Sequence, residues 1–218
     1  MVATLINYVP EIRELIEPSG LLDFLAIKAS KEGYIALLKA LAERWWDTTN
    51  TFHFPCGEMT VTPTDITMIT GLHFGTRALE FFDDWRNLPP GTVRDLLGAE
   101  PPRDSLYIPR SWIRSRVDEL SSVAGLIENP EHVARTAILM ILGCSFVHTM
   151  RDTVNLNVLR SLLDLSILEQ YDWAGATLSV MYREMGDMSR GIFSSLGGTS
   201  FIWEVCMKVI FYLFSLFL

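Results

Sequence analysis

The segment Thr51–Leu72 constrains the fold more than any other part of the chain. Apolar and polar residues alternate in 51–54 and again in 59–62, which is the period of a strand with one buried face. Between these runs stands Pro55-Cys56-Gly57, where proline presets a turn dihedral and glycine tolerates positive φ. The segment therefore predicts a short β-hairpin near residues 51–62.

A helix with defined ends is predicted to follow the hairpin directly. Thr62 stands at the N-cap position, Pro63 at the first helical position and Asp65 at the capping-box position. Gly71 supplies the residue type that commonly ends a helix with positive φ. We expect a helix of about two turns between these signals.

The ten prolines all lie at or before Pro130, which predicts short elements in the first part of the chain and longer helices in the second. Apolar spacing and proline positions in the first part predict five helices besides the one after the hairpin. They are Pro10–Glu17, Leu21–Ser30, a helix with a stripe of Tyr34, Leu38, Leu41 and Trp45, a short helix near Val93–Leu97, and Arg110–Leu120.

Two longer helices are predicted in the second part. Asn129-Pro130-Glu131 combines a cap, a first-turn proline and an acid, and the almost wholly apolar run 137–147 that follows is typical of a buried central helix. Gly143 in this run would permit close approach of a neighbour. Asp172 is predicted to cap the next helix, whose stripe is Ala174, Leu178, Met181 and Met185. The chain is long enough for one sizeable core, so we predict a mainly α, irregular multi-helix single domain with one short β-hairpin.

The net charge of −8 argues against a protein that holds nucleic acid through its overall electrostatics. A local basic face would depend on four arginines that are interspersed with acids, and this pattern predicts a solvated helix face instead. The arginines are Arg103, Arg110, Arg114 and Arg116, and the acids are Asp104, Asp118 and Glu119. We therefore predict no direct nucleic-acid binding.

Four residues are candidate ligands of a Cys2His2 zinc site: His53, Cys56, Cys144 and His148. Cys144 and His148 lie one helical turn apart and would share a face. The spacing matches no standard zinc motif, however, and free cysteines usually behave as small buried hydrophobes. We therefore predict neither a metal nor a cofactor.

Pyridoxal phosphate chemistry, the first enzymatic alternative, requires a Schiff-base lysine and a phosphate cradle. The only lysines are Lys28, Lys31, Lys39 and Lys208, and Gly197-Gly198-Thr199-Ser200 is more typical of a turn than of an anion site. The chain also lacks the alternating βαβ pattern of that fold.

Two further catalytic hypotheses involve fewer residues. Glu80, Asp83 and Asp84 would suit a two-metal nuclease, but acids flanked by prolines in a loop are usually solvated. Cys56 and His53 would suit acyl transfer, but residues three apart in a strand face opposite sides. We predict no catalytic residues.

Four blocks of residues appear in order along the chain. The first is Trp45, then Phe52-His53-Phe54-Pro55-Cys56-Gly57-Glu58-Met59-Thr60, then Asp65 and Gly71-Leu72. The second is Leu142-Gly143-Cys144 with Asn155-Leu156; the third is Tyr171-Asp172-Trp173-Ala174 with Tyr182-Arg183-Glu184; the fourth is Gly197-Gly198 before Trp203. Across roughly residues 20–205 the chain resembles the plant mobile domain, the aminotransferase-like domain of MAINTENANCE OF MERISTEMS-like proteins and of long-form homologues of serine/threonine phosphatase 7.

The resemblance implies a plant-specific domain linked to transposable elements. It implies a nuclear role in gene silencing and meristem maintenance, carried out through protein partners such as phosphatase-like or other mobile-domain proteins. No catalytic residues accompany the family, so the resemblance implies a non-enzymatic interaction module despite the aminotransferase-like label. Two alternatives remain open: a transposon-derived remnant without function, and an uncharacterised enzyme.

The chain departs from the family pattern after Glu204. We therefore expect residues 1–204 to be a mobile domain truncated at its C-terminal end and residues 205–218 to be an atypical apolar tail. The run Val209–Leu218 spans about 15 Å as a helix, about half of a bilayer core, so membrane anchoring is a minor alternative to packing on the core. A third reading is a translated intron, because Val205-Cys206-Met207 can be encoded by bases that resemble a plant donor splice site.

Overall fold

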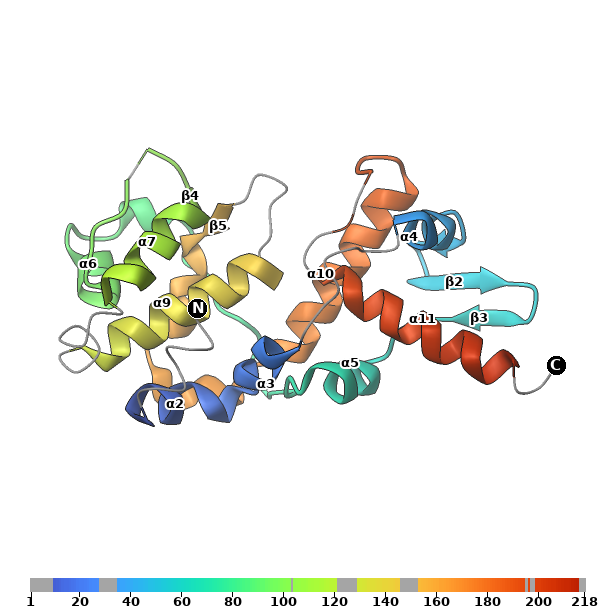
Figure 1. Ribbon diagram of the computed structural model, residues 1–218. Coiled ribbons are helices and arrows are strands. Elements are labelled where there is room, and N and C mark those ends of the chain that lie inside the picture. The colour runs from blue at the N-terminus through green and yellow to red at the C-terminus, as the bar shows by residue number, and fades with distance from the viewer. Residues whose placement is uncertain are drawn as a thin grey trace.

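The computed structural model describes residues 10–27, 35–102, 104–120, 129–145, 153–194, 196 and 199–215. Helices dominate, and the described strands form a three-stranded and a two-stranded antiparallel sheet, which confirms the mainly α prediction. In Figure 1 the elements form two groups, with α3 (Leu21–Ala26) and α10 (Trp173–Ser189) lying between them. One cluster of buried apolar residues runs through both groups.

The first group surrounds α9 (Pro130–Ser145), the helix that was predicted to be central. Every residue from 133 to 142 is buried. The helices α2 (Pro10–Ile16), α6 (Thr92–Leu97) and α7 (Arg110–Leu120) all pack against α9. Burial on all sides explains why residues 137–143 of this helix carry no polar side chain.

The two-stranded sheet lies beside the C-terminal half of α9. In it β4 (Tyr107–Pro109) pairs antiparallel with β5 (Thr153–Asn155), and Ile108 faces Val154. A Cβ placed on Gly143 would overlap Val154 Cγ2. The close approach predicted at Gly143 is therefore confirmed, and its partner is strand β5.

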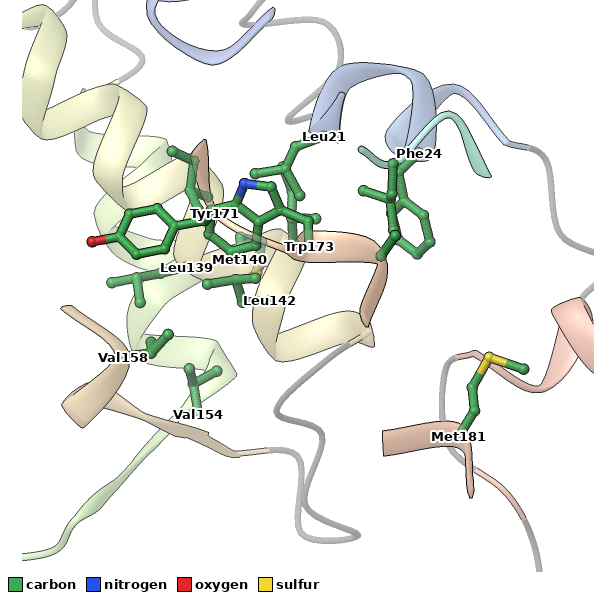
Figure 2. Packing of buried hydrophobic residues seen from close by; sticks show 14 of the residues in the cluster. Leu21, Phe24, Leu139, Met140, Leu142, Val154, Val158, Tyr171, Trp173 and Met181 are labelled. Atoms are coloured by element: carbon green, nitrogen blue, oxygen red, sulfur yellow. The ribbon is translucent and has the colours of Figure 1, made fainter. Parts of the chain in front are cut away.

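Between β5 and α10 the chain forms two 3-10 helices that the sequence did not predict, η3 (Leu156–Leu162) and η4 (Leu165–Gln170). The backbone N–H of the second residue in each helix, Asn157 or Ser166, donates to the side chain of Asn155 or Asp164, respectively. Tyr171 and Trp173, which follow this segment, lie edge-on to each other with ring centroids 5.9 Å apart, in the same buried cluster as Leu139 of α9 (Figure 2). The unbroken burial of residues 156–159 anchors the segment to the core.

The second group contains α4 (Ile35–Ala42), α5 (Pro63–Thr70), α11 (Ser200–Ser215) and the three-stranded sheet. The sheet has the order β1 (Trp45–Trp46), β2 (Thr51–Phe54), β3 (Gly57–Met59), and each neighbouring pair is antiparallel. The predicted hairpin is thus confirmed as β2 and β3, although β3 ends at Met59. The extra strand β1 was not predicted.

The helix predicted after the hairpin is confirmed in its residues and in both ends. Thr62 and Asp65 form a reciprocal capping box, with the Thr62 backbone N–H 2.7 Å from an Asp65 carboxylate oxygen. Gly71 ends α5 with a φ of 73°. Asp172 likewise caps α10, because its side chain accepts a hydrogen bond from the backbone N–H of Gly175.

One prediction in this group is wrong: Trp45 does not belong to the third helix. Helix α4 ends at Ala42, and Trp45 begins strand β1, opposite Phe52. The backbone N–H of His53 bonds the carbonyl of Arg44 at 2.9 Å, so pairing with β2 takes over from the helix here. Trp45 is buried as predicted, but it enters the core from a strand.

Other predicted boundaries shift by small amounts. The helix predicted over Leu21–Ser30 ends at Ala26, and Lys28–Ser30 and Tyr34 lie outside the described residues.

Helix α11 continues without a break through Glu204 into the predicted tail. Cys206 and Met207 are buried, so the start of the tail packs on the core. Within the part of the chain that the structure describes, no helix is long and apolar enough to cross a membrane.

Candidate interaction surface

The three-stranded sheet has one buried and one exposed face because successive residues of a strand point to opposite sides. Register places Trp45, Phe52 and Met59 across from one another on the inner face. It places Trp46 beside Thr51 and His53 beside Glu58 on the outer face. The two faces have different partners and different consequences.

The inner face gathers aromatic residues from three of the sequence blocks into one cluster. Trp45 lies edge-on to Phe52 with ring centroids 4.7 Å apart, and Trp203 of α11 lies edge-on to both, at 5.5 and 5.2 Å. Tyr182 of α10 packs against Trp45 at 5.6 Å. Such edge-to-face contacts stabilise beyond simple area burial. The aromatic positions of these blocks therefore serve packing.

Hydrogen bonds fix the same sheet to α10. The hydroxyl of Tyr182 donates to the carbonyl of Val61 at 2.6 Å, and the hydroxyl of Thr60 donates to the carbonyl of Asn50 at 2.6 Å. Arg190, at the end of α10, forms an ion pair with Asp47 directly after β1. The sheet is therefore held at its inner face and at the end of β1.

The outer face presents a polar and aromatic surface that we term the platform, formed by Trp46, Thr51, His53 and Glu58. The rings of Trp46 and His53 stack, with centroids 4.6 Å apart and planes 10° apart. His53 Nε2 lies 3.7 Å from a carboxylate oxygen of Glu58, and Thr51 donates a 3.1 Å hydrogen bond to the other oxygen. Trp46 is 57% exposed, whereas Trp45 beside it is 5% exposed. The platform thus holds a large aromatic ring in a fixed orientation toward solvent.

Trp46 was missed as a candidate although the sequence contains a usable signal. Two adjacent tryptophans in a strand must point to opposite sides of the sheet. Once one of them is assigned to the core, the other is exposed. The signal was hidden because Trp45 was assigned to a helix.

The four candidate zinc ligands are only partly placed. His53 belongs to the platform, and Cys56 is exposed in the hairpin turn, two positions before Glu58. His148 and the side chain of Cys144 lie outside the described residues. Over the described ranges, no three His, Cys, Asp or Glu side chains gather closely enough to hold a metal. The prediction that these four residues bind no metal therefore stays a prediction.

Two of the three acids considered for metal-dependent catalysis, Glu80 and Asp84, are paired with arginines. Glu80 accepts hydrogen bonds from Arg77 and Arg160, which lower the pKa of its carboxyl below its ordinary value, the bond from Arg77 contributing most. Asp84 is paired with Arg86, whose hydrogen bonds lower the pKa of Asp84 in the same way. Paired carboxylates of this kind are held as anions and are poor proton donors near neutral pH.

The described lysines lie on separate elements, whereas three of the four candidate arginines, Arg110, Arg114 and Arg116, share helix α7. Lys39 is exposed on α4 and Lys208 is exposed on α11, while Lys28 and Lys31 lie outside the described residues, as do Gly197 and Gly198. Arg116 donates to the carbonyl of Leu97 and to Glu119. These contacts tie α7 to the end of α6.

Cys206 differs from Cys56 in that its side chain is buried, whereas that of Cys56 is exposed. Burial raises the pKa of the Cys206 thiol to about 12, so this thiol stays protonated at neutral pH. Cys206 therefore serves as a buried apolar side chain of α11.

Comparison with known proteins agrees with the order of the sequence blocks. A sequence profile of the plant mobile domain matches residues 24–209. Three similar proteins come from Arabidopsis thaliana. Protein MAINTENANCE OF MERISTEMS is 29% identical over 165 residues, Serine/threonine-protein phosphatase 7 long form homolog 30% over 168, and Protein MAIN-LIKE 2 31% over 157.

These alignments cover 75%, 75% and 70% of the chain but only 34%, 12% and 23% of the respective relatives. The chain therefore spans about a third or less of the length of the curated relatives it matches. No solved structure matches it. Since the profile covers most of the sequence and includes every block that forms the aromatic cluster, this chain belongs to the plant mobile domain family.

Proposed function

We propose that this domain is a non-enzymatic interaction module of the plant nucleus that acts in meristem maintenance and in silencing of transposable elements through protein partners. The nuclear and silencing parts follow from the resemblance to the family. One relative is named for the maintenance of meristems and another as a long-form homologue of a serine/threonine-protein phosphatase. These names support a phosphatase-like protein or another mobile-domain protein as the partner.

The observation that carries the proposal is the exposed ring of Trp46 on a sheet fixed from behind. Tryptophan is enriched among the residues that dominate protein interfaces, because it buries a large area at a low cost in conformational entropy. Stacking on His53 restricts the orientation of the ring before a partner arrives. A preorganised aromatic ring of this kind suits recognition of a protein surface.

The proposal is tested by affinity purification of the tagged full-length protein from plant nuclei, followed by identification of partners. Trp46→Ala removes the ring, and Tyr107→Ala is the matched control, because Tyr107 is an exposed aromatic residue on strand β4. We expect a phosphatase-like or mobile-domain partner with the wild type and the control. We expect its recovery to fall about tenfold or more with Trp46→Ala.

Two results would contradict the proposal. Equal recovery of the partner with Trp46→Ala would exclude the platform as the interface. Recovery of chaperones alone by the wild-type protein would favour the remnant without function. Unchanged circular dichroism and thermal midpoint of the Trp46→Ala variant would show that its loss of binding does not come from unfolding.

A further inference from the structure

A second surface, in the other group of elements, has the features of a binding site. An open hollow of about 530 Å³ lies beside the loop that leads into the 3-10 helix η2 (Trp85–Asn87), and it is lined by residues 81–84, Asn87, Leu88 and Arg160. This volume is within the range of ligand pockets in proteins. We term it the loop hollow, and the side chains that matter for its chemistry are Phe81, Phe82, Asp83, Asp84 and Arg160.

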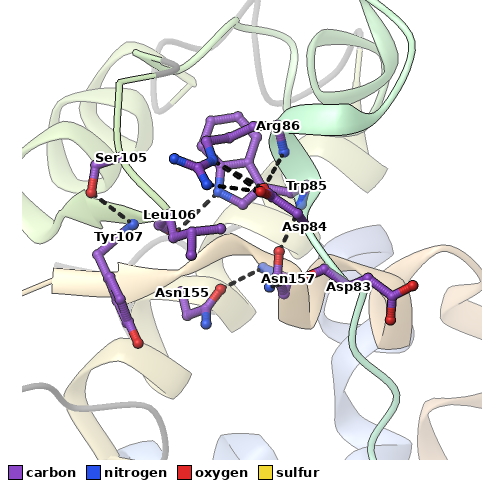
Figure 3. Close-up of polar contacts among 9 residues, drawn as sticks. All are labelled: Asp83, Asp84, Trp85, Arg86, Ser105, Leu106, Tyr107, Asn155 and Asn157. Carbon is purple, nitrogen blue, oxygen red and sulfur yellow. Dashed lines mark hydrogen bonds and ion pairs between the residues drawn. The ribbon is translucent and has the colours of Figure 1, made fainter.

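The wall of the loop hollow is fixed by buried polar side chains of η3. Asn157 is buried; its carbonyl accepts from the backbone N–H of Phe82, and its side-chain oxygen accepts from the backbone N–H of Trp85, both at 2.8 Å. Ser161 bonds both the N–H and the carbonyl of Glu80. Figure 3 shows Asn157 lying beneath the loop, in contact with its backbone. The wall is therefore formed before any ligand binds.

Trp85 holds the same wall in place through contacts with the hydrophobic core. Its ring is fully buried, and its indole N–H donates to the carbonyl of Leu106 at 3.1 Å. With Trp85 directed inward, the neighbouring side chains of the loop are left to face the hollow and solvent. Phe81 is 47% exposed, which is unusual for a phenylalanine in a segment held this firmly.

The charged side chains of the hollow differ in whether they are already paired. Asp84 binds Arg86, and Arg160 binds Glu80 while its guanidinium lies 5.9 Å from the ring centroid of Phe82. The carboxylate of Asp83, by contrast, has no ion pair or hydrogen bond among the described residues, although the Asp83 backbone carbonyl accepts a hydrogen bond from the side chain of Asn157. In Figure 3 its carboxylate points away from the other labelled side chains. The hollow thus offers one uncompensated negative charge next to an exposed aromatic ring.

We propose that the loop hollow binds an arginine side chain from a partner protein, with the guanidinium paired to Asp83 and its flat face on the ring of Phe81. Arginine fits this combination because its planar head binds a carboxylate through two hydrogen bonds and also stacks on aromatic rings. Its apolar stem would lie along the exposed apolar surface of the loop. Because Asp84 is paired with Arg86 and Arg160 with Glu80, Asp83 is the lining charge left for a ligand, and it favours a cation over an anion.

The proposal is tested with a capped peptide, acetyl-Ala-Arg-Ala-amide, titrated into the isotopically labelled protein and followed by the backbone amide signals of the 80–88 loop. A single side chain in an open hollow is expected to bind with a Kd of about 1 mM. Asp83→Asn keeps the size of the side chain and removes the charge, and Phe81→Ala removes the ring. Each is expected to weaken binding about tenfold.

The controls separate this site from non-specific attraction and from the platform. Asp118→Asn removes an exposed acid of α7 and should leave the affinity unchanged. Trp46→Ala should also leave it unchanged, whereas Asp83→Asn should leave capture of the nuclear partner through the platform unchanged. Failure at one surface is therefore distinguishable from failure at the other.

Three results would overturn the assignment. They are a titration without saturation, an equal loss of affinity in Asp118→Asn, and equally tight binding of the lysine peptide acetyl-Ala-Lys-Ala-amide. Saturable binding that prefers arginine and depends on both Asp83 and Phe81 would support it. Unaltered thermal midpoints of the two variants would show that the loop retains its fold.

Discussion

The phenol hydroxyl of Tyr182 donates a 2.6 Å hydrogen bond to the backbone carbonyl of Val61, and so joins α10 to the chain directly after β3. Val61 is buried, which leaves water little access to this carbonyl. Both positions stand in or beside the sequence blocks that mark the family. This single bond therefore connects two blocks that are far apart in the sequence.

Tyr182→Phe is expected to lower the free energy of unfolding by about 1 kcal/mol, because it leaves the Val61 carbonyl without its donor while the ring contact with Trp45 stays. Chemical denaturation of the variant and the wild type measures the difference. Tyr107→Phe, at an exposed tyrosine, is the matched control and should change little. If Tyr182→Phe lowers the free energy of unfolding no more than the control does, the hydrogen bond makes no net contribution to stability.

Gly143→Ala is expected to destabilise the fold by about 1–3 kcal/mol, because the new Cβ would overlap Val154 Cγ2. Without that overlap, the same change in a helix interior would stabilise by roughly 1 kcal/mol. Gly186→Ala in α10 is the matched control, since its nearest neighbour would be 3.5 Å away. Thermal unfolding should therefore move the two variants in opposite directions.

A double variant tests whether overlap with Val154 causes the destabilisation expected for Gly143→Ala. Adding Val154→Ala to Gly143→Ala should cost less than the sum of the two single changes, because the shortened side chain makes room for the Cβ. Additive losses would mean that Gly143 is needed for another reason.

The thiols of Cys56 and Cys206 should differ strongly in reactivity. Cys56 is exposed in the hairpin turn, whereas burial raises the pKa of Cys206 to about 12. Iodoacetamide at neutral pH should therefore modify Cys56 first and Cys206 only after denaturant unfolds the protein. Site-resolved mass spectrometry measures both rates. Rapid modification of Cys206 in the native protein would contradict the packing of α11.

Glu80→Gln should destabilise the protein at neutral pH and make little difference in acid. Hydrogen bonds from Arg77 and Arg160 lower the pKa of Glu80 in the folded state. The ionised form therefore stabilises the fold above the unfolded pKa of about 4.3, and this contribution is lost as the pH falls through the lowered pKa. Denaturant midpoints of both proteins across this range measure the effect. Glu11→Gln, at an exposed position of α2, is the matched control.

The parts of the fold that were predicted correctly depend on residues close together in the chain. The capping box of α5 joins Thr62 to Asp65, and Asp172 caps α10 through Gly175. The buried central helix α9 was evident because almost every residue of 137–147 is apolar. Local hydrogen bonds and apolar content of this kind are legible in the sequence because they need no distant partner.

Trp45 shows where such reasoning fails. Its spacing from Leu38 and Leu41 matches a helix, but pairing with Phe52 places it in β1. Both structures direct the indole into the same core, so the apolar pattern does not separate them. The strand forms because Arg44 and Trp45 pair with residues of β2. This pairing exists only in the assembled sheet.

The sequence by itself determined the helix starts and stops, the central helix and, through the order of its motif blocks, the family. Only the tertiary structure decided that Trp45, Phe52, Tyr182 and Trp203 meet in one cluster, that Trp46 faces solvent on His53, and that Asn157 holds the loop beneath Phe81 and Asp83. The physical reason is that exposure and pairing of a side chain depend on which distant elements pack against its own. Short-range sequence patterns, such as the adjacent Trp45 and Trp46, narrow that choice, and the packing of distant elements decides it.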